Sequence, residues 1–199
     1  MERVLTYDKL WFAQETKLKE QELIANVLNG DNDAFKEIVK KYASRVAATV
    51  IGMLGHCPEA EDIGQEAFVR LYQSLHKFRG ESSLATYLTR IAINLSLNEI
   101  RRRGRQRKLY LTNSEEKIDT FADTTNHNEQ KETSELVQRG LQKLPVKFRS
   151  VIVLRLIDGY STEETAKILN LPVGTVLSRL SRAQMKLKNI LTPLYKGET

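Results

Sequence analysis

An apolar repeat through residues 62–108 is the feature that most constrains the fold of this chain. Apolar side chains recur at Ile63, Ala67, Leu71 and Leu75 and, after a break, at Leu84, Leu88, Ile91 and Leu95. A spacing of three or four residues places side chains on one face of an α-helix, whereas a strand would need alternation. The repeat therefore predicts two consecutive amphipathic helices, separated by the polar stretch 77–83.

The outer faces of these two helices differ in chemistry. The first leaves Asp62, Gln65 and Glu66 facing outward. The loop and the second helix present a different set: Phe78, Arg79, Ser82, Ser83, Tyr87, Arg90, Asn94, Arg101, Arg102 and Arg103, with the basic run continuing to residue 108. Aromatic rings beside cations suit single-stranded nucleic acid, and dense positive charge suits phosphates. The alternative is that the aromatic side chains are ordinary packing residues and the arginines a solvated helix end.

Helical patterns also precede this pair. A short amphipathic helix precedes Asn29 and Gly30, and a longer helix starts after the capping residues 31–33 and ends near Gly55. Four helices in series with short connections predict a compact all-α domain over residues 20–108. Residues 1–19 form an N-terminal extension with one apolar cluster at 10–12, to which no function is assigned.

Composition changes over residues 109–133, which are rich in Thr, Asn, Ser and acidic residues and contain few large apolar ones. Such a segment cannot bury enough apolar surface to fold alone, so it is predicted to be a flexible acidic linker. Two interpretations stay open. It is a solvating spacer, or it is a strand that lies in a basic channel of a partner.

A second helical domain is predicted over residues 134–199. Residues 151–154 are rich in β-branched side chains, but the flanking period favours a helix. Ser161 and Glu164 have the spacing of a capping box, and a tight turn at 170–174 leads into a final helix. The outward side chains of that helix are Thr175, Ser178, Arg179, Ser181 and Arg182. A short helix, a turn and a polar, cationic second helix predict a helix-turn-helix that enters a DNA major groove.

Composition excludes several other classes of function. The net charge of +6 over 199 residues favours a polyanionic partner. Cys57 is the single cysteine, so neither an internal disulfide nor a cysteine-rich zinc site can form. The sequence contains no pattern of a catalytic nucleophile and base, so we expect no enzyme activity, no metal and no cofactor. The absence of a long apolar run predicts no membrane insertion and a cytoplasmic location.

Four stretches together resemble a known family. They are DIGQEAF at 62–68, FRG at 78–80, YLTRIAIN at 87–94 and PVGTVLSRLSRA at 172–183. Each is short, but their order and spacing resemble the extracytoplasmic-function (ECF) group of bacterial RNA polymerase sigma factors of the sigma-70 family. The resemblance covers roughly residues 20–191. It implies a factor that binds core polymerase, directs it to promoters and helps to melt the −10 element.

The resemblance also implies roles for the surfaces already described. Asp62, Gln65 and Glu66 would face the clamp of the beta-prime subunit, and the C-terminal domain would meet the beta flap. The loop at 78–83 with Asn94 would hold a flipped base of the −10 element, while Tyr87, Arg90 and the basic run would hold the opened strand. Residues 175–182 would read the −35 element. An anti-sigma factor is a further expected partner, and the linker would lie toward the basic RNA exit path.

Three positions depart from the usual pattern of this family. Tyr87 stands where relatives often have tryptophan, and Asn98 stands where aspartate is common. Leu177 stands where many relatives place an arginine against −35 DNA, which leaves the contact at that point open. The competing hypothesis for the whole chain is a free-standing helix-turn-helix regulator that binds duplex DNA as a dimer.

Overall fold

The computed structural model describes residues 18–113 and 129–195, and the regular structure in these two ranges is helical throughout. A helix over residues 18–28 is followed by α2 (Asn32–Leu54), α3 (Pro58–Ser74), the 3-10 turn η1 (Leu75–Lys77) and α4 (Leu84–Asn113). The C-terminal part contains α5 (Glu129–Lys143), α6 (Val146–Ile152), the π-helical turn η2 (Val153–Ile157), α7 (Thr162–Leu169) and α8 (Val173–Tyr195). The all-α prediction is confirmed.

Side-chain caps set the starts of the helices in the N-terminal unit, which comprises residues 18–113. The Asp31 carboxylate accepts hydrogen bonds from the backbone N–H groups of residues 33 and 34. At the other end, α2 is followed by Gly55, whose φ of 80° suits glycine. Ser83 accepts from the backbone N–H of Thr86 and caps α4. Pro58 occupies the first turn of α3, so this helix begins four residues earlier than the apolar repeat indicates.

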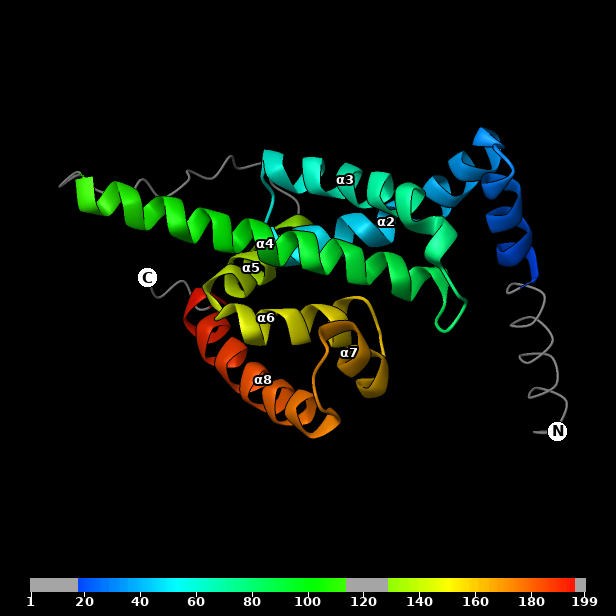
Figure 1. Ribbon diagram of the computed structural model, residues 1–199. Helices are drawn as coiled ribbons and strands as arrows, with labels where there is room; N and C mark the ends of the chain where they lie inside the picture. The colour runs from blue at the N-terminus through cyan, green and yellow to red at the C-terminus, as the bar shows by residue number, and fades with distance from the viewer. Residues whose placement is uncertain (1–17, 114–128, 196–199) are drawn as a thin grey trace, which may run out of the picture.

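Helices α2, α3 and α4 pack against one another around one apolar core (Figure 1). The predicted inward residues of α3 and α4 lie in this core, with Ile63 and Ile91 half-buried at its margin. Figure 1 shows α4 as the long helix that crosses the molecule, with α3 beside it. The outward faces of α3 and α4 therefore belong to one rigid unit.

The C-terminal unit, residues 129–195, contains the predicted helix-turn-helix. Ser161 and Glu164 exchange both hydrogen bonds of a capping box at the start of α7. Asn170 ends that helix in the left-handed conformation, with φ of 52°, which asparagine tolerates better than most residues. α8 then buries Val176 and Ala183. The stretch 151–154 is helical, as its flanks predicted.

The two units are packed against each other. Val153, Leu154, Tyr160 and Ile168 of the C-terminal unit belong to the same apolar core as the helices of the N-terminal unit. In Figure 1 α7 lies beside the N-terminal half of α4, and these two helices are in contact. The sequence left this arrangement undetermined, because local patterns carry no information on how distant segments meet.

Two predicted segments lie partly or wholly outside the described residues. The N-terminal extension falls almost entirely within residues 1–17, which include the apolar cluster at 10–12. Helix α4 continues to Asn113 and α5 begins at Glu129, so helix occupies both ends of the stretch predicted as linker. Among the helices described, none combines the length and the apolar character that crossing a bilayer would require.

Candidate nucleic-acid and polymerase interface

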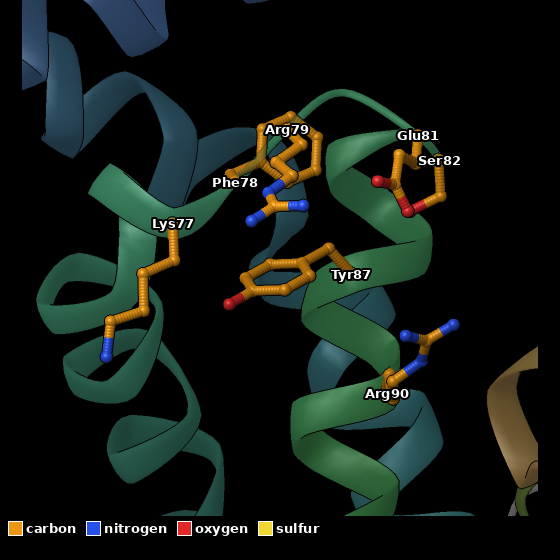
Figure 2. Close-up of a pocket in the computed structure, with 7 residues that line it drawn as sticks. All are labelled: Lys77, Phe78, Arg79, Glu81, Ser82, Tyr87 and Arg90. Atoms are coloured by element: carbon orange, nitrogen blue, oxygen red, sulfur yellow. The ribbon is translucent and has the colours of Figure 1, made fainter.

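A hollow of about 290 Å³ opens between the loop after η1 and the start of α4. Its lining residues are Lys77, Phe78, Arg79, Glu81, Ser82, Tyr87 and Arg90 (Figure 2). The volume is near the lower limit of roughly 300–1,000 Å³ for small-molecule pockets. The hollow therefore has room for one planar group such as a base.

Two aromatic rings form one wall of this hollow. The ring centroids of Phe78 and Tyr87 are 5.3 Å apart, and the ring planes are inclined by 59°. The Tyr87 hydroxyl donates a hydrogen bond of 3.0 Å to Ser74 Oγ, which holds the ring in place. Both residues are half-buried and pack on the core. The packing and the stacking interpretations thus apply to the same rings, because both residues pack on the core and also line the hollow.

The cations of the hollow lie on different sides of it. Lys77 and Arg79 are exposed, and Figure 2 shows the Arg79 guanidinium near the Tyr87 ring. Arg90 extends from the other side of α4. It donates a hydrogen bond of 3.3 Å to the backbone carbonyl oxygen of Lys167 in α7.

The structure brings half of the residues predicted for the −10 site into the lining of the hollow: Phe78, Arg79, Ser82, Tyr87 and Arg90. Ser83 caps α4, and Asn94 is exposed further along α4, outside the lining of the hollow. Glu81, within the predicted loop 78–83, and Lys77, just before it, also line the hollow, although neither is among the individually predicted site residues. Their position in the sequence could have predicted this, because both residues lie within three positions of Phe78.

Much of the basic run at the end of α4 is held by acidic side chains. Arg102 and Arg103 both donate to the carboxylate of Glu99, at 2.7–2.9 Å, and Arg103 also pairs with Glu59 at 3.1 Å. The hydrogen bond from Arg102 is the main reason that the pKa of buried Glu99 lies below its usual value, while burial acts in the opposite direction. Arg103 therefore ties α4 to the start of α3.

The remaining arginines of this run are more open. Arg101 is exposed and donates a hydrogen bond of 3.1 Å to Asn98 Oδ1 within the same helix. Arg105 and Arg107 are exposed as well. A phosphate can reach these three side chains without breaking a buried ion pair.

The outer face of α3 carries the acidic residues predicted to recruit polymerase. Asp62 and Gln65 are exposed. Glu66 is half-buried and accepts a hydrogen bond of 2.7 Å from Arg70 one turn later. A solvent-exposed pair of this kind contributes little to stability, so Glu66 can exchange its partner at small cost.

The outer face of α8 carries the residues predicted to read duplex DNA. Ser178, Ser181 and Arg182 are exposed, and Thr175 and Arg179 are half-buried at the flank. Leu177 is 53% exposed on the same helix, which is high for a leucine. The face therefore offers hydroxyls, cations and one apolar group to a groove.

Comparison with known proteins finds a matching family model for each of the two helical units. The family model for Sigma-70 region 2 matches residues 38–106, and the model for Sigma-70, region 4 matches residues 134–187. The RNA polymerase sigma-H factor of Pseudomonas aeruginosa is 31% identical over 189 residues, which cover 91% of this chain and 98% of that one. The ECF RNA polymerase sigma factor SigW of Bacillus subtilis is 36% identical over 182 residues, 86% of this chain and 96% of the relative.

The chain belongs to the ECF group of the sigma-70 family. The ECF RNA polymerase sigma-E factor of Escherichia coli is 34% identical over 190 residues, 90% of this chain and 98% of that factor. The protein thus has a sigma-factor role in transcription initiation, as its motifs predicted. The matches to both sigma-70 regions favour this role over that of a free-standing regulator.

Solved structures agree with this sigma factor in fold. The structure of CnrH in complex with the cytosolic domain of CnrY has a TM-score of 0.64 and 25% identity, over 87% of this chain and 97% of that one. The sigma factor RpoE in complex with the anti-sigma factor NepR from Bartonella quintana has a TM-score of 0.63, and at 24% identity it supports the fold alone. It covers 79% of this chain and 96% of the other.

Proposed function

We propose that this sigma factor divides promoter opening among three surfaces. The outer face of α3 binds the beta-prime clamp of core polymerase, the hollow between the η1–α4 loop and α4 holds the opened −10 strand, and α8 reads the −35 element. The observation that carries the proposal is the hollow itself, since two aromatic rings stand there beside Lys77 and Arg79. Few other sites need stacking surfaces and cations in one place.

In this proposal, the hollow offsets part of the free energy that is lost when the base pairs of the −10 element separate. Each base-pair step of duplex stacking is worth about 1.4 kcal/mol. A base that leaves the stack regains much of this on an aromatic face, at roughly 1–3 kcal/mol per base. The rings of Phe78 and Tyr87 can accept it, and exposed Arg79, Arg101 and Arg105 can neutralise the backbone phosphates nearby.

The remaining partners follow from the family and are part of the proposal. The C-terminal unit meets the beta flap of the polymerase, and an anti-sigma factor binds the sigma factor when it is inactive. A cytoplasmic location fits these partners. The function requires no cofactor, because the polymerase supplies the chemistry.

Run-off transcription with purified core polymerase on pooled genomic fragments tests the proposal. Adding the chain should produce discrete transcripts that start downstream of one shared pair of elements. Replacing Asp62 and Glu66 by alanine should remove these transcripts and weaken binding to core polymerase, whereas Glu37→Ala, an exposed acidic control on α2, should change neither. Tight binding to duplex DNA without polymerase, and no new transcripts, would instead indicate a free-standing regulator.

The proposed contacts of Tyr87 and Asn94 with the opened strand are tested separately, on the promoters that run-off transcription identifies. Tyr87→Ala and Asn94→Ala should reduce permanganate reactivity of −10 thymines more than they reduce closed-complex formation. Normal melting by the Asn94 variant would remove that residue from the site. This outcome would agree with its position outside the hollow in the free chain.

A further inference from the structure

The C-terminal unit carries a pair of lysines that the proposed function leaves unused. Lys147, in the first turn of α6, holds its ammonium nitrogen 5.2 Å from the centroid of the Phe148 ring. Lys186 reaches the same ring from α8, at 6.0 Å. Helices α6 and α8 pack against each other and lie side by side in Figure 1. Two segments that are distant in the sequence therefore place two cations at one point of the surface.

The aromatic ring holds both lysines in position. Phe148 is 6% exposed and belongs to the apolar core of the C-terminal unit, so its own place is fixed. A cation within about 6 Å of a ring centroid is attracted by the ring. Surface lysines lose rotamer freedom when they bind a ligand, and this loss opposes binding. Here part of the loss has already occurred in the folded chain, so the pair is ordered before an anion arrives.

The charge of this lysine pair is not neutralised within the chain described here. In residues 18–113 and 129–195, neither ammonium group forms an ion pair with an acidic side chain. Both side chains are exposed. Two like charges beside one ring repel each other, and a bound anion would relieve that repulsion. The pair thus meets the electrostatic requirements of a site for a polyanion.

The lysine pair continues one flank of the helix that is proposed to read the −35 element. Arg179, Arg182 and Lys186 follow one another at spacings of three and four residues, which places them along one flank of α8. Lys147 extends this flank onto α6 through the shared ring. Lys188 lies on a different flank of α8, because two residues correspond to about 200° of rotation. The cations therefore form a strip that begins among the proposed base-reading residues.

The length of α8 places the two ends of this strip against different parts of a duplex. An α-helix rises 1.5 Å per residue, so Lys186 lies about 12 Å along the axis from Ser178. The major groove is about 12 Å wide, and phosphates form its rim. When Ser178 faces base edges inside the groove, the lysine pair lies at or beyond the rim. Each strand offers a phosphate there about every 3.4 Å along the axis.

We propose that Lys147 and Lys186 form a clamp for the DNA backbone next to the −35 element, outside the bases that α8 reads. The inference rests on the proposed −35 function of α8. Phosphate contacts fix the register and orientation of a protein on a duplex, whereas base contacts carry the sequence information. The clamp therefore positions α8 in the groove without adding sequence preference. It also gives α6 a DNA contact, which the proposed function does not include.

The salt dependence of promoter binding by the holoenzyme tests this clamp. The probe is a fluorescein-labelled promoter fragment identified by run-off transcription, and anisotropy is measured between about 50 and 200 mM salt. Lys147→Gln and Lys186→Gln should each lower the slope of log K against log salt by about 0.9, with affinity about five- to tenfold lower at 0.1 M salt. Lys188→Gln removes the same charge from the other flank of α8 and should change neither value. Lys186→Arg should retain the slope.

Neutral phosphates locate the contact on the DNA. Methylphosphonate is placed at one position at a time on both sides of the −35 element. One or two positions should weaken binding of the unaltered holoenzyme, and the variant that carries both Lys147→Gln and Lys186→Gln should be insensitive to them. Substitution of −35 bases should affect this double variant and the unaltered holoenzyme equally, because the clamp reads no base.

The other outcomes separate the clamp from the proposed function. If the lysine variants keep the full slope while Arg182→Ala weakens discrimination among −35 bases, the clamp is wrong and the −35 function stands. If Lys188→Gln lowers the slope equally, general positive charge accounts for the effect, and the clamp is wrong. If the lysine variants bind core polymerase less tightly but DNA normally, the pair contacts a protein instead. If run-off transcription yields no promoter, the proposed function fails together with the clamp.

Discussion

Asp158 is a residue whose position in the fold changes its chemistry. Thr49 Oγ1 lies 2.9 Å from its Oδ2 and 3.0 Å from the Arg45 carbonyl oxygen, yet the hydroxyl has one proton for two acceptors. A protonated Asp158 would donate to Thr49, and every partner would then be satisfied. Burial, opposed by the Thr49 hydrogen bond and the charge of Arg45, raises the pKa of Asp158 from 3.8 to about 6.

This pKa shift predicts how stability depends on pH. The folded chain favours protonated Asp158, so the stabilising contribution is complete below the unfolded pKa of 3.8 and is lost as pH rises through about 6. At pH 7.5 the ionised carboxylate reduces the free energy of unfolding, by about 2 kcal/mol after allowance for partial exposure.

Asp158→Asn should therefore stabilise the chain at pH 7.5 in urea unfolding and change it little at pH 4. The difference between the variant and the unaltered chain should develop between about pH 4 and 6, the interval set by the two pKa values. A constant difference across this interval would show that Asp158 does not titrate in it. Glu163→Gln, an exposed acidic control on α7, should shift neither curve.

Leu177 gives a second prediction at the scale of one side chain. An apolar group on a recognition helix can contact the methyl group of thymine, which is unique to that base in the major groove. In polymerase holoenzyme, deoxyuridine in place of one −35 thymine should weaken promoter binding by about three- to tenfold. Leu177→Ala should remove this sensitivity, while Met185→Ala, also exposed on α8, should retain it. Equal sensitivity in all three proteins would exclude the methyl contact.

At the scale of elements, the stability of helix α7 depends on the cap at its N-terminal end. The helix has eight residues, too few to be stable alone in water, and its capping box satisfies two backbone groups there. Ser161→Ala should cost about 1 kcal/mol of the free energy of unfolding, measured in urea. Thr192→Ala, exposed on α8, should cost less than about 0.5 kcal/mol. Equal losses would mean that the box does not limit the stability of α7.

The sequence predicted the elements well because their signals are local. The Asp31 and Ser83 caps, the Asn29–Gly30 stop and the Ser161 capping box each involve residues within a few positions of one another. The apolar repeat places the start of α3 four residues too late, because the first turn begins with Pro58, which is favoured there but adds no residue to the apolar pattern. The motif around Phe78 predicts the loop that closes the hollow, but it does not single out the side chains of Lys77 and Glu81.

At the scale of the whole molecule, Arg149 joins the two units. Its guanidinium donates to the carbonyl oxygens of Met53, Gln142 and Leu144 and to the Gln142 side chain, at 2.6–3.1 Å. Burial without a carboxylate partner lowers its pKa to about 10. The planar fork fits several acceptors at once, which the single ammonium of a lysine cannot do.

Arg149→Lys should therefore destabilise both units together. The expected loss is about 2–4 kcal/mol, since buried carbonyl groups are left without donors. Hydrogen exchange should show reduced protection in the C-terminal turns of α2 and in α6 alike. Loss of protection confined to α6 would show that Arg149 serves only its own unit. Lys147→Arg, an exposed substitution on α6, is the matched control and should leave both regions protected.

The sequence by itself determined the helices, their caps, the helix-turn-helix and the chemical character of each outer face. These features depend on residues a few positions apart, so a pattern of three or four residues can encode them. Only the tertiary structure decided that Arg90 meets the Lys167 carbonyl, that Gly52 admits Val153 and that Asp158 is buried against Thr49. These contacts join residues about 80–110 positions apart, and no local pattern reports on desolvation or on the partner that causes it.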